Sequence, residues 1–175
     1  MPSDVPKAMP RDEPLTGATL REIGLFGALS DDVVDHLAKT LKTMRAAPGE
    51  TIFREGDAAG REMFVLVVGE MEITKRSRRG RDTRVAILGP TDWFGEMSVL
   101  DMQARSATVR ALAPSVLIRF TSEDMDALYR YDLKSYALIV LNIARDLSRR
   151  LRVTDGILAD FTANLLDEYV SSGKH

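Results

Sequence analysis

The apolar pattern of this chain changes its period at Thr121, and that change limits the folds the chain can adopt. From Pro48 to Thr121, short apolar runs are separated by Gly, Pro and Asp, a pattern typical of β-strands joined by turns. The runs are 51–53, 63–68, 71–74, 85–88 and 116–120. Short strands in close succession predict an antiparallel β-sandwich or barrel of the jelly-roll type.

Helical patterns flank these strands. Ser30 is a typical N-cap residue, and the apolar residues from Val33 to Leu41 recur at helical spacing, so we expect a short helix up to about Thr43. A second short helix begins at Ser122, and a much longer pattern runs from about Leu133 to Tyr169. Its seam residues alternate at spacings of four and three: Val140, Ala144, Leu147, Leu151, Thr154, Leu158, Phe161 and Leu165.

This seam is typical of a two-stranded coiled coil, and it predicts a parallel homodimer. The alternative is a long helix that packs only on its own sandwich. In the coiled-coil register Arg150 is a g residue and Asp155 the following e residue, so the two are expected to pair between subunits. Thr154 is the polar residue of the seam, where its hydroxyl can simply bond to the carbonyl four residues before it.

The chain therefore divides into four parts. Residues 1–18 contain four prolines and little apolar periodicity, which predicts a flexible leader. Residues 19–132 form the jelly roll with its short helices, 133–170 the coiled-coil-like helix and 171–175 a tail. The predicted fold class is α+β: an antiparallel jelly-roll sandwich flanked by helices, with a long C-terminal dimerisation helix.

Composition excludes several classes of protein. The net charge of −2 gives no general electrostatic reason to bind nucleic acid. No apolar run approaches the ~18 residues of a membrane span and the start lacks a signal sequence, so we expect a cytoplasmic protein without membrane contact. With no cysteine and only His36 and His175, neither a thiolate metal site nor a multi-histidine metal centre is expected.

One strongly charged segment surrounds Gly80, and its basic residues are Lys75, Arg76, Arg78, Arg79, Arg81 and Arg84. Such a hairpin can contact RNA, DNA or an acidic partner. Because no aromatic residue is interleaved for base stacking, a solvated hairpin is the favoured interpretation.

The stretches 94–100 and 105–109 carry the most specific chemistry. Gly95 permits close approach of backbone amides to a ligand, a helix can begin after it, and Arg105 supplies a countercharge. These are the parts of an anion pocket. Glu96 would repel an anion, but it can accept a proton from a hydroxyl, so the ligand is expected to carry both a phosphate and a sugar diol.

Together these stretches resemble the phosphate-binding cassette of the cyclic nucleotide-binding domain family. The resemblance extends from about Leu25 to Leu158 and includes the segments 25–30, 48–57 and 64–71. It implies that Arg105 binds the cyclic phosphate, that Glu96 accepts the ribose 2′-hydroxyl, and that Thr154 meets the purine. The implied ligand-binding residues are Gly95, Glu96, Met97, Ser98, Arg105, Ser106, Ala107 and Thr154.

Ser106 and Thr154 together favour cAMP over cGMP within this family, although a hydroxyl alone can pair with either purine. Asp155 departs from the serine found there in catabolite activator proteins, which brings a cross-subunit contact to the base into question. Only residues 171–175 follow the seam, where transcriptional members continue into a DNA-binding module, so a stand-alone member without DNA binding is expected.

The sequence therefore predicts a dimeric, non-enzymatic cyclic nucleotide receptor that has no cofactor and acts on a downstream protein whose identity is unknown. The alternative is a dimeric scaffold with the same fold and a pocket that does not bind nucleotide. A catalytic role is not expected, because Glu96 has no paired base or metal set in the sequence.

Overall fold

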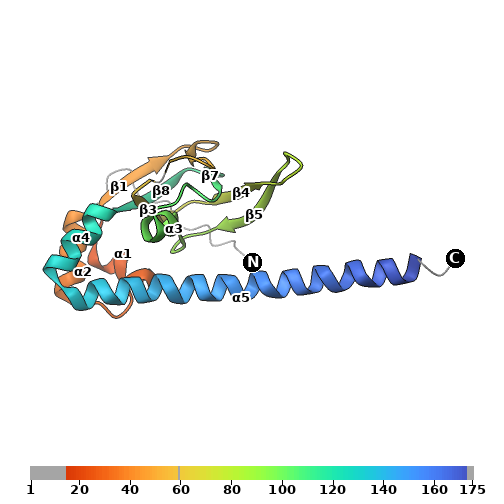
Figure 1. Ribbon diagram of the computed structural model, residues 1–175. Helices are drawn as coiled ribbons and strands as arrows, with labels where there is room; N and C mark the ends of the chain where they lie inside the picture. Colours follow the sequence, from red (N-terminus) through yellow and green to blue (C-terminus); the bar gives the residue numbers. More distant parts are fainter. Residues whose placement is uncertain (1–14, 59, 173–175) are drawn as a thin grey trace, which may run out of the picture.

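The computed structural model describes residues 15–58 and 60–172, with only the backbone described for 165–172 (Figure 1). Most of the predicted leader and the end of the predicted tail lie outside these residues. The elements in chain order are α1 (Gly17–Arg21), the 3-10 turn η1 (Gly24–Phe26), α2 (Asp31–Thr40), β1 (Lys42–Ala46), β2 (Thr51–Phe53), β3 (Glu62–Val68), β4 (Met71–Arg76), β5 (Asp82–Leu88), β6 (Trp93–Phe94), α3 (Glu96–Asp101), β7 (Thr108–Ala111), β8 (Ser115–Thr121), α4 (Ser122–Tyr131) and α5 (Leu133–Ser172).

The strands form two antiparallel four-stranded sheets, which confirms the predicted sandwich. One sheet has the order β1-β8-β3-β6 and the other β2-β7-β4-β5. Strands β1, β6 and β7 were not among the predicted runs, and β6 has only two residues. The predicted helix end at Thr43 is wrong: α2 ends at Thr40, and Lys42 to Ala46 pair with β8. Pairing with a distant strand outweighs the local helical pattern there.

Strands β3 and β8 are buried on both faces, and this explains why they read as continuous apolar runs. Phe64 and Leu66 of β3 face the interior of the sandwich, where Met71, Phe94 and Leu117 meet them. The intervening residues of β3, Met63 and Val65, face a second core formed with the helices. The helical residues of this core include Leu25, Phe26, Val34, Leu37, Leu128, Ile139 and Ile143.

Helix α5 has two halves with different surroundings. Asp132 interrupts the path from α4 to α5 with an extended backbone, and its carboxylate accepts hydrogen bonds from the backbone and hydroxyl of Ser135. Ile139 and Ile143 are then fully buried against the domain, and Val140 and Leu147 of the predicted seam also pack there. From residue 151 to 164 every side chain is exposed, and the helix runs free of the sandwich (Figure 1).

Gly69, between β3 and β4, has a backbone conformation and a neighbourhood that exclude a side chain. Its φ is +106°, and a Cβ there would lie 2.1 Å from Ser115 Oγ and 2.7 Å from Ser115 Cα.

We expect Gly69→Ala to lower the free energy of unfolding by about 3 kcal/mol, from backbone strain and overlap together. Urea denaturation measures this. Gly49→Ala is the control, because Gly49 has a φ of +84° but no atom within 4 Å of a Cβ, and about 1 kcal/mol is expected. Equal losses in the two variants would contradict the role of Ser115.

Candidate functional site

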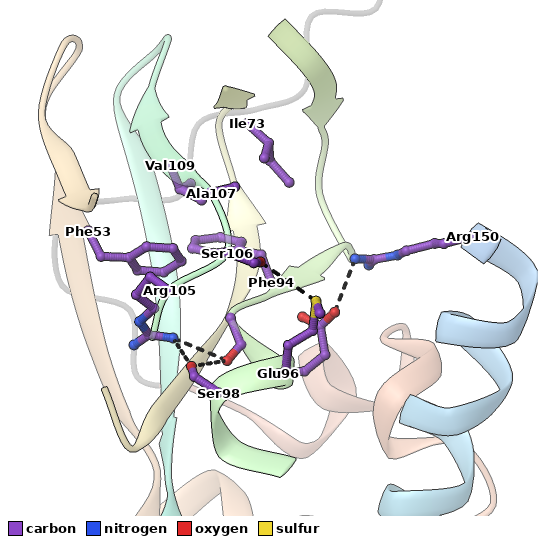
Figure 2. A pocket seen from close by; sticks show the side chains of 12 residues that line it. Phe53, Ile73, Phe94, Glu96, Ser98, Arg105, Ser106, Ala107, Val109 and Arg150 are labelled. Carbon is purple, nitrogen blue, oxygen red and sulfur yellow. Dashed lines mark hydrogen bonds and ion pairs between the residues drawn. The ribbon is translucent and has the colours of Figure 1, made fainter. Parts of the chain in front are cut away.

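A cavity of about 110 Å³ opens between the sandwich, α3 and α5 (Figure 2). All of the predicted ligand-binding residues except Thr154 line it. The cavity is lined by Phe53, Ile73, Phe94, Gly95, Glu96, Met97, Ser98, Arg105, Ser106, Ala107, Val109 and Arg150. The lining residues that were not predicted from the sequence are Phe53, Ile73, Phe94, Val109 and Arg150. The apolar ones look like ordinary core residues there, and only the fold turns them toward the cavity.

Gly95 sets the start of α3. It has a φ of +82°, which glycine adopts without strain, and a Cβ there would lie 2.8 Å from Arg105 Nη1. The helix therefore begins directly against the arginine. As in any helix, the first backbone N–H groups of α3 have no acceptor inside the helix. The close approach at Gly95 in this structure is to Arg105, whereas the sequence analysis expected a close approach to a ligand.

Arg105 is buried, with only 4% of its surface exposed, and it is held through one corner of its guanidinium. Nη1 donates to Glu62 O at 2.9 Å, to Gly95 O at 3.1 Å and to Ser98 Oγ at 2.7 Å. The guanidinium carbon lies 4.1 Å from the centre of the Phe53 ring. Burial lowers the pKa of Arg105, while the charges of Glu62, Asp57 and Glu96 oppose this shift.

The three hydrogen bonds of the Arg105 guanidinium all come from Nη1. Nε and Nη2 donate to no acceptor among the residues that the structure describes. A buried guanidinium is stabilised by acceptors or anions at its remaining N–H groups, and Gly60 lies against this edge: a Cβ there would be 2.2 Å from Nη2 and 3.0 Å from Nε. Ser106 also lines the cavity, and its hydroxyl donates to Met97 Sδ at 3.7 Å.

Glu96 is the second buried ionisable group of the cavity, with 3% of its surface exposed. Burial raises the pKa of its carboxyl group, and the charge of Arg150 acts in the opposite direction. Arg150 Nη1 lies 3.4 Å from Glu96 Oε1 and Nη2 donates to Trp93 O at 2.8 Å, so α5 is attached to the start of α3 (Figure 2).

Arg150 also forms an ion pair within α5, since its Nε lies 2.7 Å from Asp146 Oδ2. Two buried carboxylates, Glu96 and Asp146, thus share one guanidinium. In the sequence Arg150 was assigned to an ion pair with Asp155 of a second subunit, whereas here it is engaged inside its own chain. The sequence did contain a signal for the contact within α5: Asp146 lies four residues before Arg150, and residues at this spacing are neighbours on a helix.

Thr154 does not reach the cavity of its own chain. It is exposed on α5, and its hydroxyl donates to Arg150 O at 3.0 Å. This is the local bond that the sequence analysis gave as the simpler alternative.

Two further features of the described residues bear on function. No group of three or more His, Cys, Asp or Glu side chains is placed to hold a metal ion in the described ranges. Within the same ranges, no helix is both long and apolar enough to cross a bilayer.

Residues 43–132 match the family model described as the cyclic nucleotide-binding domain, and the chain belongs to this family. It is 31% identical over 141 residues to a CRP-like cAMP-activated global transcriptional regulator of Mycobacterium tuberculosis, covering 81% of this chain and 61% of that protein. It is 36% identical over 108 residues to a cGMP-dependent protein kinase of Eimeria tenella, covering 62% of this chain and 10% of the kinase.

Among solved structures, the catabolite activator protein of Thermus thermophilus superposes with a TM-score of 0.70 at 32% identity, covering 79% of this chain and 63% of that one. The chain thus spans about three fifths of the length of the two bacterial proteins. The family and the fold together define a regulatory domain of the cyclic nucleotide-binding type.

Arg150 is expected to control the ionisation of Glu96. Replacing it in Arg150→Gln removes the charge that opposes the effect of burial, so the pKa of Glu96 should rise further. Carboxyl-carbon NMR titration of Glu96 measures this directly. Arg149→Gln is the control, because the Arg149 side chain is 73% exposed and, among the described residues, its ion pair is with Asp146, at 3.5 Å. An unchanged Glu96 titration in Arg150→Gln would contradict the assigned ion pair.

Proposed function

We propose that this protein is a cyclic nucleotide receptor, a dimeric and non-enzymatic switch that prefers cAMP to cGMP. The observation that carries the proposal is the pairing of Arg105 and Glu96 in one cavity around Gly95. A cation with free donors suits a phosphate, and a buried carboxylate suits a hydroxyl that donates to it. A ribose cyclic phosphate presents both groups on one rigid ring.

Each predicted residue then has a role in binding. The Nε and Nη2 edge of Arg105 binds the phosphate, and the hydroxyl and amide of Ser106 contact it from the next residue. Ala107 leaves space for the phosphate beside the backbone. Glu96 accepts the 2′-hydroxyl, and the first-turn amides of α3, at Met97 and Ser98, add partial positive charge.

Binding requires the cavity to change shape. Its volume of about 110 Å³ is smaller than the ~300 Å³ at which ligand pockets begin. The nucleotide also competes with Arg150 for Glu96. Because Arg150 is on α5, a ligand that releases this contact changes the attachment of α5 to α3. The ligand can shift this equilibrium only by binding one arrangement more tightly than the other.

The choice of cAMP rests on Ser106, on Thr154 and on relatives. The Mycobacterium tuberculosis relative is named as cAMP-activated and the Eimeria tenella kinase as cGMP-dependent. The bacterial relative covers more of this chain, and this supports cAMP. Thr154 lies outside the cavity of its own chain, so in this proposal its hydroxyl meets the purine only after the rearrangement at α5.

The dimer is proposed to form through the free half of α5. Leu151, Leu158 and Phe161 expose 60%, 60% and 58% of their surfaces. Exposed apolar residues at alternating spacings of three and four are the seam of a coiled coil, and a second copy of the helix covers them. The state of α5 then passes to a downstream protein, without catalysis by this domain.

Calorimetric titration tests the receptor proposal. Wild-type protein should bind cAMP more tightly than cGMP, and 2′-deoxy-cAMP should bind weakly because Glu96 loses its hydroxyl. Arg105→Ala should weaken cAMP binding roughly 10- to 150-fold, as expected for a charge-assisted contact. Arg45→Ala, an exposed arginine on β1, serves as the control. If no cyclic nucleotide binds the folded wild type, the scaffold alternative replaces the proposal.

Affinity for cAMP should depend on pH through Glu96. Its pKa is raised in the free protein, and the 2′-hydroxyl donates to the ionised carboxylate. Lowering the pH through this raised pKa therefore protonates Glu96 and weakens binding, while the ionised form above it binds fully. Titrations between about pH 5 and 7.5 measure the effect. Glu96→Gln should bind weakly at every pH, and a parallel pH dependence in this variant would assign the effect to another group.

A further inference from the structure

Two glycines lie against the guanidinium of Arg105, one beside each of its terminal nitrogens. A Cβ at Gly95 would lie 2.8 Å from Nη1, and a Cβ at Gly60 would lie 2.2 Å from Nη2 and 2.8 Å from Cζ. Both positions are too close to the guanidinium to carry a side chain without a shift. Arg105 therefore occupies a slot that depends on the absence of a side chain at both residues.

The Nη1 corner and one face of the guanidinium are covered as well. The centre of the Phe53 ring lies 4.1 Å from the guanidinium carbon. Nη1 has two N–H bonds, and three oxygen atoms surround it: Glu62 O at 2.9 Å, Gly95 O at 3.1 Å and Ser98 Oγ at 2.7 Å. A phosphate oxygen can therefore bond to Nη1 only by replacing one of these acceptors.

The loop before β3 contacts the backbone of Arg105 as well as its side chain. Gly56 N donates to Arg105 O at 2.9 Å, and Arg105 N donates to Asp57 O at 3.0 Å. The segments 56–57 and 60–62 thus lie on both parts of the residue, and only 4% of Arg105 is exposed. We call this enclosed arrangement the inward position of Arg105.

Ser98 meets the guanidinium with a side chain, whereas the other two acceptors are backbone carbonyls. Its hydroxyl accepts from Arg105 Nη1 and donates to Gly95 O at 3.1 Å, and Ser98 is itself 4% exposed (Figure 2). Because Ser98 belongs to α3, this hydroxyl joins the inward guanidinium to the helix that carries Glu96. The sequence analysis expected Ser98 to bind the ligand, but its hydroxyl is bound to Arg105 here.

We infer that Ser98 is a positioning residue that holds Arg105 in the inward position and thereby lowers the affinity for nucleotide. Gly60 is the residue that makes room for the guanidinium there. Ligand binding then requires Arg105 to leave Ser98 and Gly60 and to turn its donors toward the cavity. This inference rests on the proposed function, and it assigns a regulation to the same site.

The contacts of the inward position compete with the ligand for one guanidinium. A phosphate replaces acceptors that Arg105 already has, so the net gain on binding is reduced by what those contacts contribute. The apparent affinity of a receptor is its intrinsic affinity multiplied by the fraction of molecules in the binding-competent state. A hydrogen bond made only in the inward position lowers this fraction. Removing that bond therefore raises the affinity, whereas removing Arg105 itself lowers it.

Calorimetric titration with cAMP measures the effect of Ser98→Ala. The variant keeps the backbone amide of residue 98 and loses a bond of the inward position, so it should bind cAMP roughly three- to tenfold more tightly than wild type. Ser115→Ala is the matched control. Ser115 is 3% exposed, and its hydroxyl also donates to one backbone carbonyl, Ala113 O, and accepts from one N–H, that of Glu70. Its affinity for cAMP should equal that of wild type.

Gly60→Ala tests the same assignment from the other side of the guanidinium. A Cβ 2.2 Å from Nη2 is incompatible with the inward position, and the φ of Gly60 lies outside the left-handed region, so alanine adds no backbone strain. The affinity for cAMP should rise by at least as much as in Ser98→Ala. Gly89→Ala is the control, because a Cβ at Gly89 meets no atom within 4 Å.

Two further measurements separate the lost contact from a general loosening of the domain. In stopped-flow experiments both variants should show faster association with cAMP and unchanged dissociation, because the contact is broken before the ligand is bound. NMR of arginine Nε–H groups, recorded without nucleotide, reports on Arg105 directly. Its signal, identified by its loss in Arg105→Lys, should exchange slowly with water in wild type and faster in both variants.

The sign of the change decides the outcome. Weaker cAMP binding by Ser98→Ala and Gly60→Ala would show that the inward position is the one that binds phosphate, and unchanged affinity would show that it does not limit binding. Either result overturns the inference and leaves the receptor proposal standing. If folded wild type binds no cyclic nucleotide, the proposed function fails. A double variant that also binds none then overturns the inference, whereas cAMP binding gained by the double variant supports it.

Discussion

The buried guanidinium of Arg105 is the interaction on which the site depends. A charge removed from water must be met by acceptors, and three of them come from separate parts of the chain: the backbone of β3 at Glu62, Gly95, and the hydroxyl of Ser98. The loop before β7, the edge of β3 and the start of α3 are thereby held together. The three contacts of Nη1 thereby fix the orientation of the guanidinium within the site.

Arg150 extends this network from the pocket to the long helix. It contacts Glu96, Trp93 and Asp146, and so it joins the start of α3 to α5 through one side chain. Burial of Glu96 opposes ionisation of its carboxyl group, and the guanidinium offsets part of that effect. Any ligand group that takes over Glu96 changes the electrostatic balance at Arg150. This is the physical route by which an event in the pocket can reach the helix.

Helix α5 combines the two interpretations that its sequence left open. Its first half packs on the domain through Ile139 and Ile143, which occupy the core formed with the short helices. In its second half, from residue 151 to 164, every side chain is exposed, including several apolar ones. The free half is therefore the part of the helix available to a partner (Figure 1).

The sequence by itself determined the sandwich, most of its strands, the long helix and the cluster of Gly95, Glu96 and Arg105, because periodicity, glycine turns and a short motif are local features of a chain. Only the tertiary structure decided the rest. The start of strand β1, Lys42 and Thr43, was assigned to a helix because its partner, β8, is distant in the sequence. Arg150 was placed at a subunit interface because a heptad register ignores the domain on which the helix packs. Which acceptors meet a buried charge depends on segments that the fold brings together, and no local pattern contains that information.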